Sequence, residues 1–161
     1  MYWNSNSSEW NVGSNKVHIG NDAGKNGKGS NSIAIGYLTG FDSQKANSVA
    51  MGSGAGYSNQ GTGSIAIGND AGFSDQRVVS VAIGQSAGFS NQGSNSVAIG
   101  NGAGFGDQRA VSVAIGQSAG FSNQGSNSVA IGNGAGFSNQ GTVSVAIGQS
   151  AGISNQGSNS V

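Results

Sequence analysis

Few residues in this chain carry groups that could do chemistry. The one histidine is His18 and there is no cysteine, so the sequence offers no thiolate metal site and no thiol nucleophile. The carboxylates are scattered, with no second acidic ligand at a fixed spacing: Glu9, Asp22, Asp42, Asp70, Asp75 and Asp107. Paired acid-base catalysis therefore has no basis in the sequence. We predict no catalytic residue, no cofactor and no metal, and a protein that is not an enzyme.

Glycine-rich stretches and charge exclude further classes of site. GNGAGFG at residues 100–106 contains G-x-G pieces but no helix is expected to follow it, so it is not a phosphate loop. Six Lys plus Arg balance six Asp plus Glu, which leaves no basic surface for nucleic acid. The apolar runs are too short for a membrane span, and the opening MYWNSNSSEW is not a secretory signal. We expect no nucleic-acid partner and no membrane insertion.

A strict internal repeat organises the chain. The glycine of an I-G pair recurs every sixteen residues from Gly20 to Gly148, with Met in place of Ile once and no insertion. Residues 17–161 hold nine repeats and the start of a tenth. A repeat this short cannot bury a face alone, so neighbouring copies must stack. The sequence predicts an all-β parallel β-solenoid, and nine turns of about 4.8 Å make a rod of roughly 43 Å.

Alternation within each repeat predicts two short strands per turn. In Ser80-Val81-Ala82-Ile83-Gly84 branched and small residues alternate, and a second strand is expected over residues 86–90. We place the bulky residues inside, because apolar burial is the usual source of stability. Ile115→Asp is then expected to unfold several turns. The predicted core of three central turns is Val81, Ile83, Ala87, Phe89, Val97, Ile99, Ala103, Phe105, Val113, Ile115, Ala119 and Phe121.

On this assignment the alanine between the branched residues points outward. Its column would form a smooth stripe that we interpret as an oligomer interface: Ala66, Ala82, Ala98, Ala114 and Ala130. The glutamines at every sixteenth position from Gln44 and the serines from Ser32 are expected to form ladders on the outside of the rod.

A second period of thirty-two residues overlies the first. Asp75 and Arg77 in one turn are matched by Asp107 and Arg109 two turns later. This spacing keeps like charges about 9.6 Å apart instead of stacked at about 4.8 Å.

Residues 1–16 differ in composition from the repeats. They hold both tryptophans and one of the three tyrosines. Such bulk suits a cap over an open solenoid end, or a docking segment for a neighbouring subunit. The predicted cap or docking residues are Tyr2, Trp3 and Trp10.

The NSVAIG stretches at residues 95–100 and 127–132, with NSIAIG at residues 31–36, resemble a known family. They are similar to the head repeats of trimeric autotransporter adhesins, the YadA-like β-roll, and to arrays in fibre-like proteins of phages and large DNA viruses. The resemblance implies a left-handed roll, a homotrimer, and binding to surfaces or matrix. No family binding residue carries over to a position of this chain.

These observations together predict a non-enzymatic structural rod. We expect a homotrimeric fibre or stalk segment at a cell or virion surface, where repetition supplies length and stiffness. Three alternatives stay open: an adhesin head that binds a host or matrix ligand, a filament that grows end to end, and an ice-binding solenoid. The last is the weakest, because ice-binding surfaces commonly use threonine ladders and the chain holds only Thr39, Thr62 and Thr142.

Overall fold

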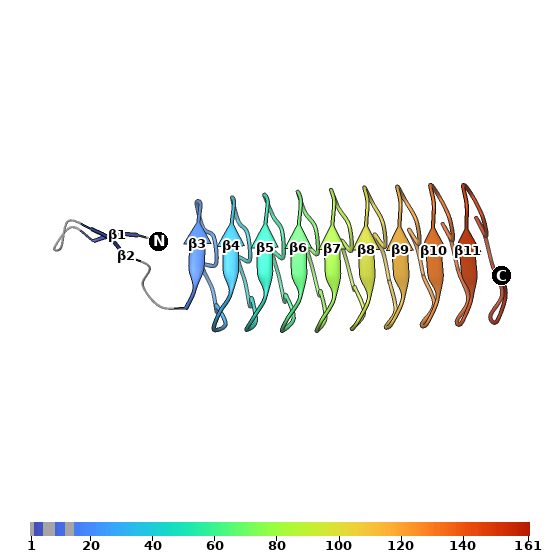
Figure 1. Ribbon diagram of the computed structural model, residues 1–161, viewed down its shortest axis with the longest axis horizontal. Helices are drawn as coiled ribbons and strands as arrows, with labels where there is room; N and C mark the ends of the chain where they lie inside the picture. The colour runs from blue at the N-terminus through green and yellow to red at the C-terminus, as the bar shows by residue number, and fades with distance from the viewer. Residues whose placement is uncertain (1, 5–8, 12–14) are drawn as a thin grey trace.

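The computed structural model describes residues 2–4, 9–11 and 15–161, with side chains described from residue 15 onward. Residues 15–161 form a rod of stacked coils without a helix (Figure 1). Nine strands follow one another along one side of the rod and form a single parallel sheet. The strands are β3 (Val17–Ile19), β4 (Ile33–Ile35), β5 (Val49–Met51), β6 (Ile65–Ile67), β7 (Val81–Ile83), β8 (Val97–Ile99), β9 (Val113–Ile115), β10 (Val129–Ile131) and β11 (Val145–Ile147).

The strands pair in the register that the repeat demands. Val81 lies opposite Val97, Ala82 opposite Ala98, and every other pair is likewise sixteen residues apart. Each turn therefore places identical columns of side chains above one another along the rod. The prediction of an all-β parallel solenoid with sixteen-residue turns is confirmed, with nine strands joined by eight turns.

The second strand expected over residues 86–90 is not formed. Ser86, Gly88 and Asn91 have φ values of 53°, 54° and 52°, which interrupt an extended conformation. Single residues on this side of the coil remain as isolated parallel bridges, such as Ser74 with Ser90. This side of the coil is nevertheless bonded to its neighbours, since Gly88 N–H donates to Ala103 O at 2.8 Å and Ser90 N–H donates to Phe105 O at 3.0 Å.

Between the strand and the wall that faces it, the interior of the coil is lined by alanines, and the predicted inside and outside of the strand are wrong. Ala66, Ala82, Ala98, Ala114 and Ala130 are fully buried, so they cannot form an oligomer interface. Of the predicted core, only the alanines of the opposite wall are buried, namely Ala87, Ala103 and Ala119. Val81, Val97, Val113, Phe89, Phe105 and Phe121 are half-buried, and Ile83, Ile99 and Ile115 are exposed.

The physical reason is the width of the coil. Opposite walls approach so closely that a Cβ added to Gly88 would lie 3.2 Å from the Ala82 Cβ. A buried isoleucine would need more room than this, and overpacking of an interior is destabilising. A sixteen-residue turn with one three-residue strand therefore places alanine inside and the branched residues outside.

The glutamine and serine columns also lie inside the coil, where the sequence had suggested outer ladders. Gln92 is fully buried, and its Nε2 donates to Val81 O at 2.7 Å. Gln76 Nε2 in turn donates to Gln92 Oε1 at 3.1 Å, so amide groups join the two turns. The buried Ser96 Oγ donates to Gly93 O within its own turn. These bonds satisfy the buried amide nitrogens and serine hydroxyls. Five buried glutamine oxygens have no hydrogen-bond partner within residues 15–161, namely Oε1 of Gln44, Gln76, Gln108, Gln140 and Gln156.

The segment before the solenoid contains two further strands. β1 (Tyr2–Asn4) and β2 (Glu9–Asn11) pair antiparallel with Trp3 opposite Trp10. The side chains of Tyr2, Trp3 and Trp10 lie outside the described part of the chain. It stays a prediction that these three residues form a cap or docking segment. The division of the chain into residues 1–16 and the solenoid is also a prediction.

Candidate interaction surfaces

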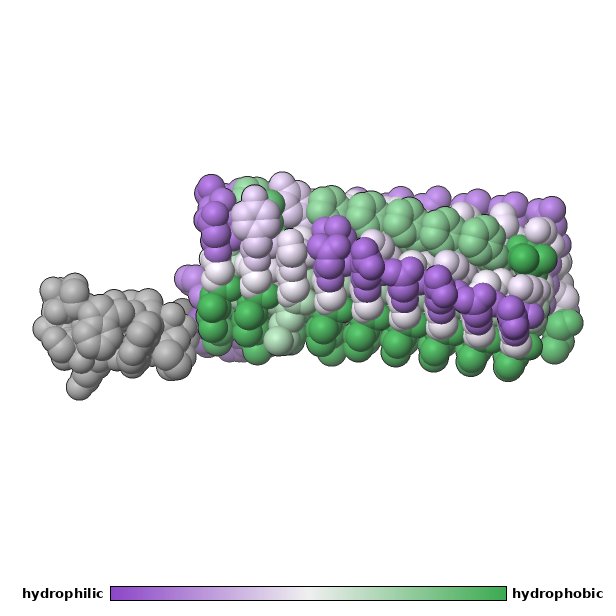
Figure 2. All heavy atoms as spheres, turned by 90° about the horizontal axis from the view of Figure 1, so that it is seen from above, coloured by the Kyte–Doolittle hydropathy of each residue, from purple (hydrophilic) through white to green (hydrophobic). Residues whose placement is uncertain are grey.

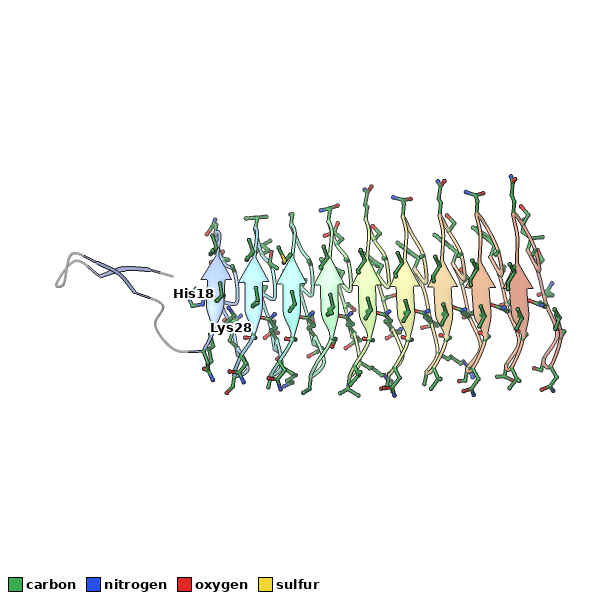
Figure 3. All side chains as sticks on the ribbon, viewed as in Figure 1. His18 and Lys28 are labelled. Atoms are coloured by element: carbon green, nitrogen blue, oxygen red, sulfur yellow. The ribbon has the colours of Figure 1, made fainter. Side chains whose placement is uncertain are left out.

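Among residues 15–161, the first turn holds two groups whose pKa is shifted from its usual value. Lys28 occupies the glutamine column, and its Nζ donates to Val17 O at 2.6 Å just as the glutamines donate in later turns. Burial lowers the pKa of Lys28 to about 8, with a smaller contribution from Lys16. Burial, followed by the charge of Lys28, also lowers the pKa of His18. Figure 3 places both residues at the N-terminal end of the solenoid.

Neither residue belongs to a larger reactive cluster. Among the described residues no group of three or more His, Asp or Glu side chains could hold a metal ion. The same part of the chain contains no helix long and apolar enough to cross a membrane. The features that can interact with other molecules are instead the columns of side chains along the rod.

An apolar column runs along the outer face of the parallel sheet. Ile83, Ile99 and Ile115 are 36%, 36% and 37% exposed, and the half-buried valines beside them widen the face. Figure 2 shows a row of hydrophobic atoms along one edge of the solenoid. Over eight turns such a row extends about 38 Å. Contiguous exposed apolar surface of this kind marks a protein interaction site more often than scattered apolar residues do.

A column of stacked aromatic rings forms a second feature. Seven rings from Phe41 to Phe137 lie 4.8–5.1 Å apart with interplanar angles of 3–6°. The column begins with Lys25, whose Nζ lies 5.7 Å from the Phe41 ring centroid. The rings are half-buried and Phe137 is exposed, so they form part of the surface as well as bracing the coil. The sequence predicted the column but placed the rings in the interior.

A third feature is a column in which every second turn carries a valine with a strained backbone. Val79, Val111 and Val143 have φ values of 53°, 57° and 52°, and more than half of each side chain is exposed. A β-branched residue at positive φ is an outlier, because its Cβ crowds the backbone there. The turns between them carry Asn95 and Asn127 at the same position. The sequence shows this alternation, but only the backbone angle shows that it costs stability.

Replacement of a strained valine is expected to stabilise the rod. Val111→Asn should raise the free energy of unfolding by about 1 kcal/mol, because asparagine tolerates the left-handed conformation. Asn127→Val, at the equivalent position one turn on, should lower the free energy of unfolding by a similar amount. Urea denaturation followed by circular dichroism measures both changes. Equal destabilisation by the two variants would contradict this account of the alternation.

Comparison with known proteins finds one family. The model of the YadA head domain repeat matches two copies, at residues 92–103 and 124–135. Both copies read QGSNSVAIGNGA, and they lie two turns apart. No curated protein and no solved structure matches the chain. The matched segments contain strands β8 and β10 with their buried alanines. The residues that match the family are therefore residues that form the coil. Two segments of this parallel β-solenoid thus match the YadA head repeat, and they follow the same sixteen-residue pattern as the other turns.

Proposed function

We propose that this chain is a non-enzymatic structural rod that assembles as a homotrimer through the outer face of its parallel sheet. The observation that carries the proposal is the exposed isoleucine column, which continues from turn to turn without a polar interruption. Burial of this column against other copies would remove a large apolar surface from water. The number three is taken from the family, since YadA head domains form trimers in general.

The expected role follows from the stacked turns. Each turn contacts only its neighbours and repeats the same bonds, so added turns lengthen the rod without new folding information. We infer a fibre or stalk segment displayed at a cell or virion surface, by analogy with YadA-like adhesins, which are surface-exposed. The left-handed coil implied by the family stays a prediction.

An adhesive head is the second candidate. The stacked and partly exposed aromatic column offers a long apolar surface on each chain that the proposed interface does not use. Aromatic side chains supply large contact areas at low entropic cost, which suits adhesion to a host or matrix ligand.

Assembly through the isoleucine face predicts a specific response to charge. The wild-type protein should show three times the mass of one chain by light scattering over a concentration series. Ile99→Asp combined with Ile115→Asp should weaken association at least a hundredfold, because the interface would bury two unpaired carboxylates.

The matched control places the same charges elsewhere. Asn101→Asp combined with Gln117→Glu also adds two carboxylates in adjacent turns, at exposed positions off the strand face. This control should remain trimeric. A wild-type monomer would contradict the proposal, mass that keeps growing with concentration would favour an end-to-end filament, and equal dissociation of both variants would assign the effect to net charge.

A further inference from the structure

Three hollows follow one another along one corner of the rod. Their volumes are about 600, 420 and 360 Å³. The first two share Arg77 in their walls, and the second and third share Arg109. Lys45 lines the first hollow. The hollows therefore adjoin one another, with Arg77 and Arg109 in the walls between them and Lys45 in the first hollow. We call this row of hollows the arginine groove.

The cations of the arginine groove are spaced by two turns. Lys45, Arg77 and Arg109 are each thirty-two residues apart. Successive aromatic rings on the same rod lie 4.8–5.1 Å apart, so two turns advance about 10 Å. The turns between carry Gly61 and Gly93, where an added Cβ would lie 2.5 Å and 2.4 Å from backbone carbon of the next turn. Close backbone packing thus keeps the space between the cations free of side chains.

The groups in the groove are available to a ligand. Lys25 and Asp22 form the one ion pair within residues 15–161, so the guanidinium groups of Arg77 and Arg109 have no carboxylate partner among these residues. Asp75 and Asp107 accept hydrogen bonds from the Nδ2 groups of Asn59 and Asn91 at 2.9 Å and 2.8 Å. Each aspartate retains acceptor sites for a hydroxyl group. The turns of Arg77 and Arg109 therefore each present a guanidinium without an ion-pair partner among residues 15–161, a carboxylate and carboxamides, whereas the Lys45 turn has Ser43 in place of the aspartate.

We propose that the arginine groove binds a linear acidic polysaccharide that carries one carboxylate per disaccharide. Two turns advance about 10 Å, which is close to the advance of a disaccharide unit in an extended polysaccharide. One guanidinium per period could hold one sugar carboxylate by paired N–H bonds, while aspartate and asparagine bind hydroxyl groups. The aspartates beside the two arginines, Asp75 and Asp107, disfavour a densely charged polymer such as nucleic acid.

The shape of the surface favours a thin chain over a second rod. The groove is concave, and two copies that met at this corner would face hollow to hollow and leave the space unfilled. A polysaccharide laid along the rod axis would fill it and contact every period. The proposal rests on the solenoid of one chain and does not depend on the proposed trimer.

Hyaluronan, an unsulfated polymer with one carboxylate per disaccharide, is the probe. Calorimetric titration into the full chain should show binding that weakens as salt is raised, and dextran, a neutral polymer, should not bind. Arg77→Gln combined with Arg109→Gln should weaken binding by about a hundredfold, or about tenfold for each guanidinium. Both arginines are exposed, so thermal unfolding of this variant should match the wild type.

The control variant removes one cation outside the groove, by Lys16→Gln, and is compared with Arg77→Gln alone. The control should bind hyaluronan as the wild type does, whereas Arg77→Gln should bind about tenfold more weakly. Absence of wild-type binding, equal binding of dextran, or equal loss in these two single variants would overturn the proposal. If the variant with Arg77→Gln and Arg109→Gln forms a smaller assembly than the wild type in the absence of hyaluronan, the groove would instead be assigned to contacts between copies. Loss of the trimer in the isoleucine variants with hyaluronan binding retained would separate the two proposals.

Discussion

Ala114→Asp is expected to unfold the middle of the rod, whereas Ile115→Asp should leave it folded. Ala114 is fully buried, and the opposite wall is so close that a Cβ added to Gly120 would lie 3.2 Å from the Ala114 Cβ. A carboxylate there would have neither room nor a partner, at a cost of about 4 kcal/mol or more. The Ile115 side chain is 37% exposed and can be replaced by a solvated carboxylate.

Urea denaturation at one protein concentration, followed by circular dichroism, measures the difference. Ala114→Ser is the matched control, because serine is a small residue of the kind that already lines the interior at Ser112 and Ser128; it should cost about 1 kcal/mol. Ile115→Asp should lose stability mainly through weaker association between chains. A folded Ala114→Asp protein together with an unfolded Ile115→Asp protein would contradict this account. It would support the assignment suggested by apolar periodicity alone, with isoleucine inside and alanine outside.

The inversion of the strand shows what the sequence pattern leaves undetermined. Alternation in Val81-Ala82-Ile83 defines two faces but does not say which face is inside. The rule that large apolar residues are buried applies to cores wide enough to hold them, and the coil of this chain is narrower. One signal in the sequence could have decided the matter. The alanine column is constant from Ala34 to Ala146, while the flanking columns admit Val, Ile and Met, so the tighter size limit lies at alanine.

Other features could be read from the period with less risk. The sixteen-residue repeat predicts stacking and register because any other pairing would place unlike residues above one another. The absence of the second strand could not be predicted, because the left-handed backbone conformation of Ser86 and Asn91 is seen only in the structure. The two-turn alternation of Arg77 and Arg109 was visible as charge spacing. The groove between these arginines could not be predicted, because it depends on close contacts of Gly61 and Gly93 with the backbone of the next turn. Such contacts between turns cannot be read from the sequence of one repeat.

Gly116→Ala is expected to produce the second large loss of stability. Gly116 follows strand β9 with a φ of 124°, and an added Cβ would lie 2.7 Å from Gly132 O in the next turn. The side chain would meet backbone that cannot move without separating the turns. We expect a loss of about 3 kcal/mol or more, from backbone strain and from the displaced neighbour.

Gly134→Ala is the matched control for this prediction. Gly134 also has a positive φ, of 65°, but the nearest atom to an added Cβ is Ser150 Oγ at 3.8 Å. The neighbouring turns already hold Ser118 and Ser150 at this position with similar backbone angles. The loss should therefore be about 1 kcal/mol. Chemical denaturation of both variants separates contact between turns from backbone conformation, since only Gly116→Ala should also reduce the cooperativity of unfolding by dividing the stack in two. Equal losses would mean that positive φ alone, and not the close approach of successive turns, requires glycine after each strand.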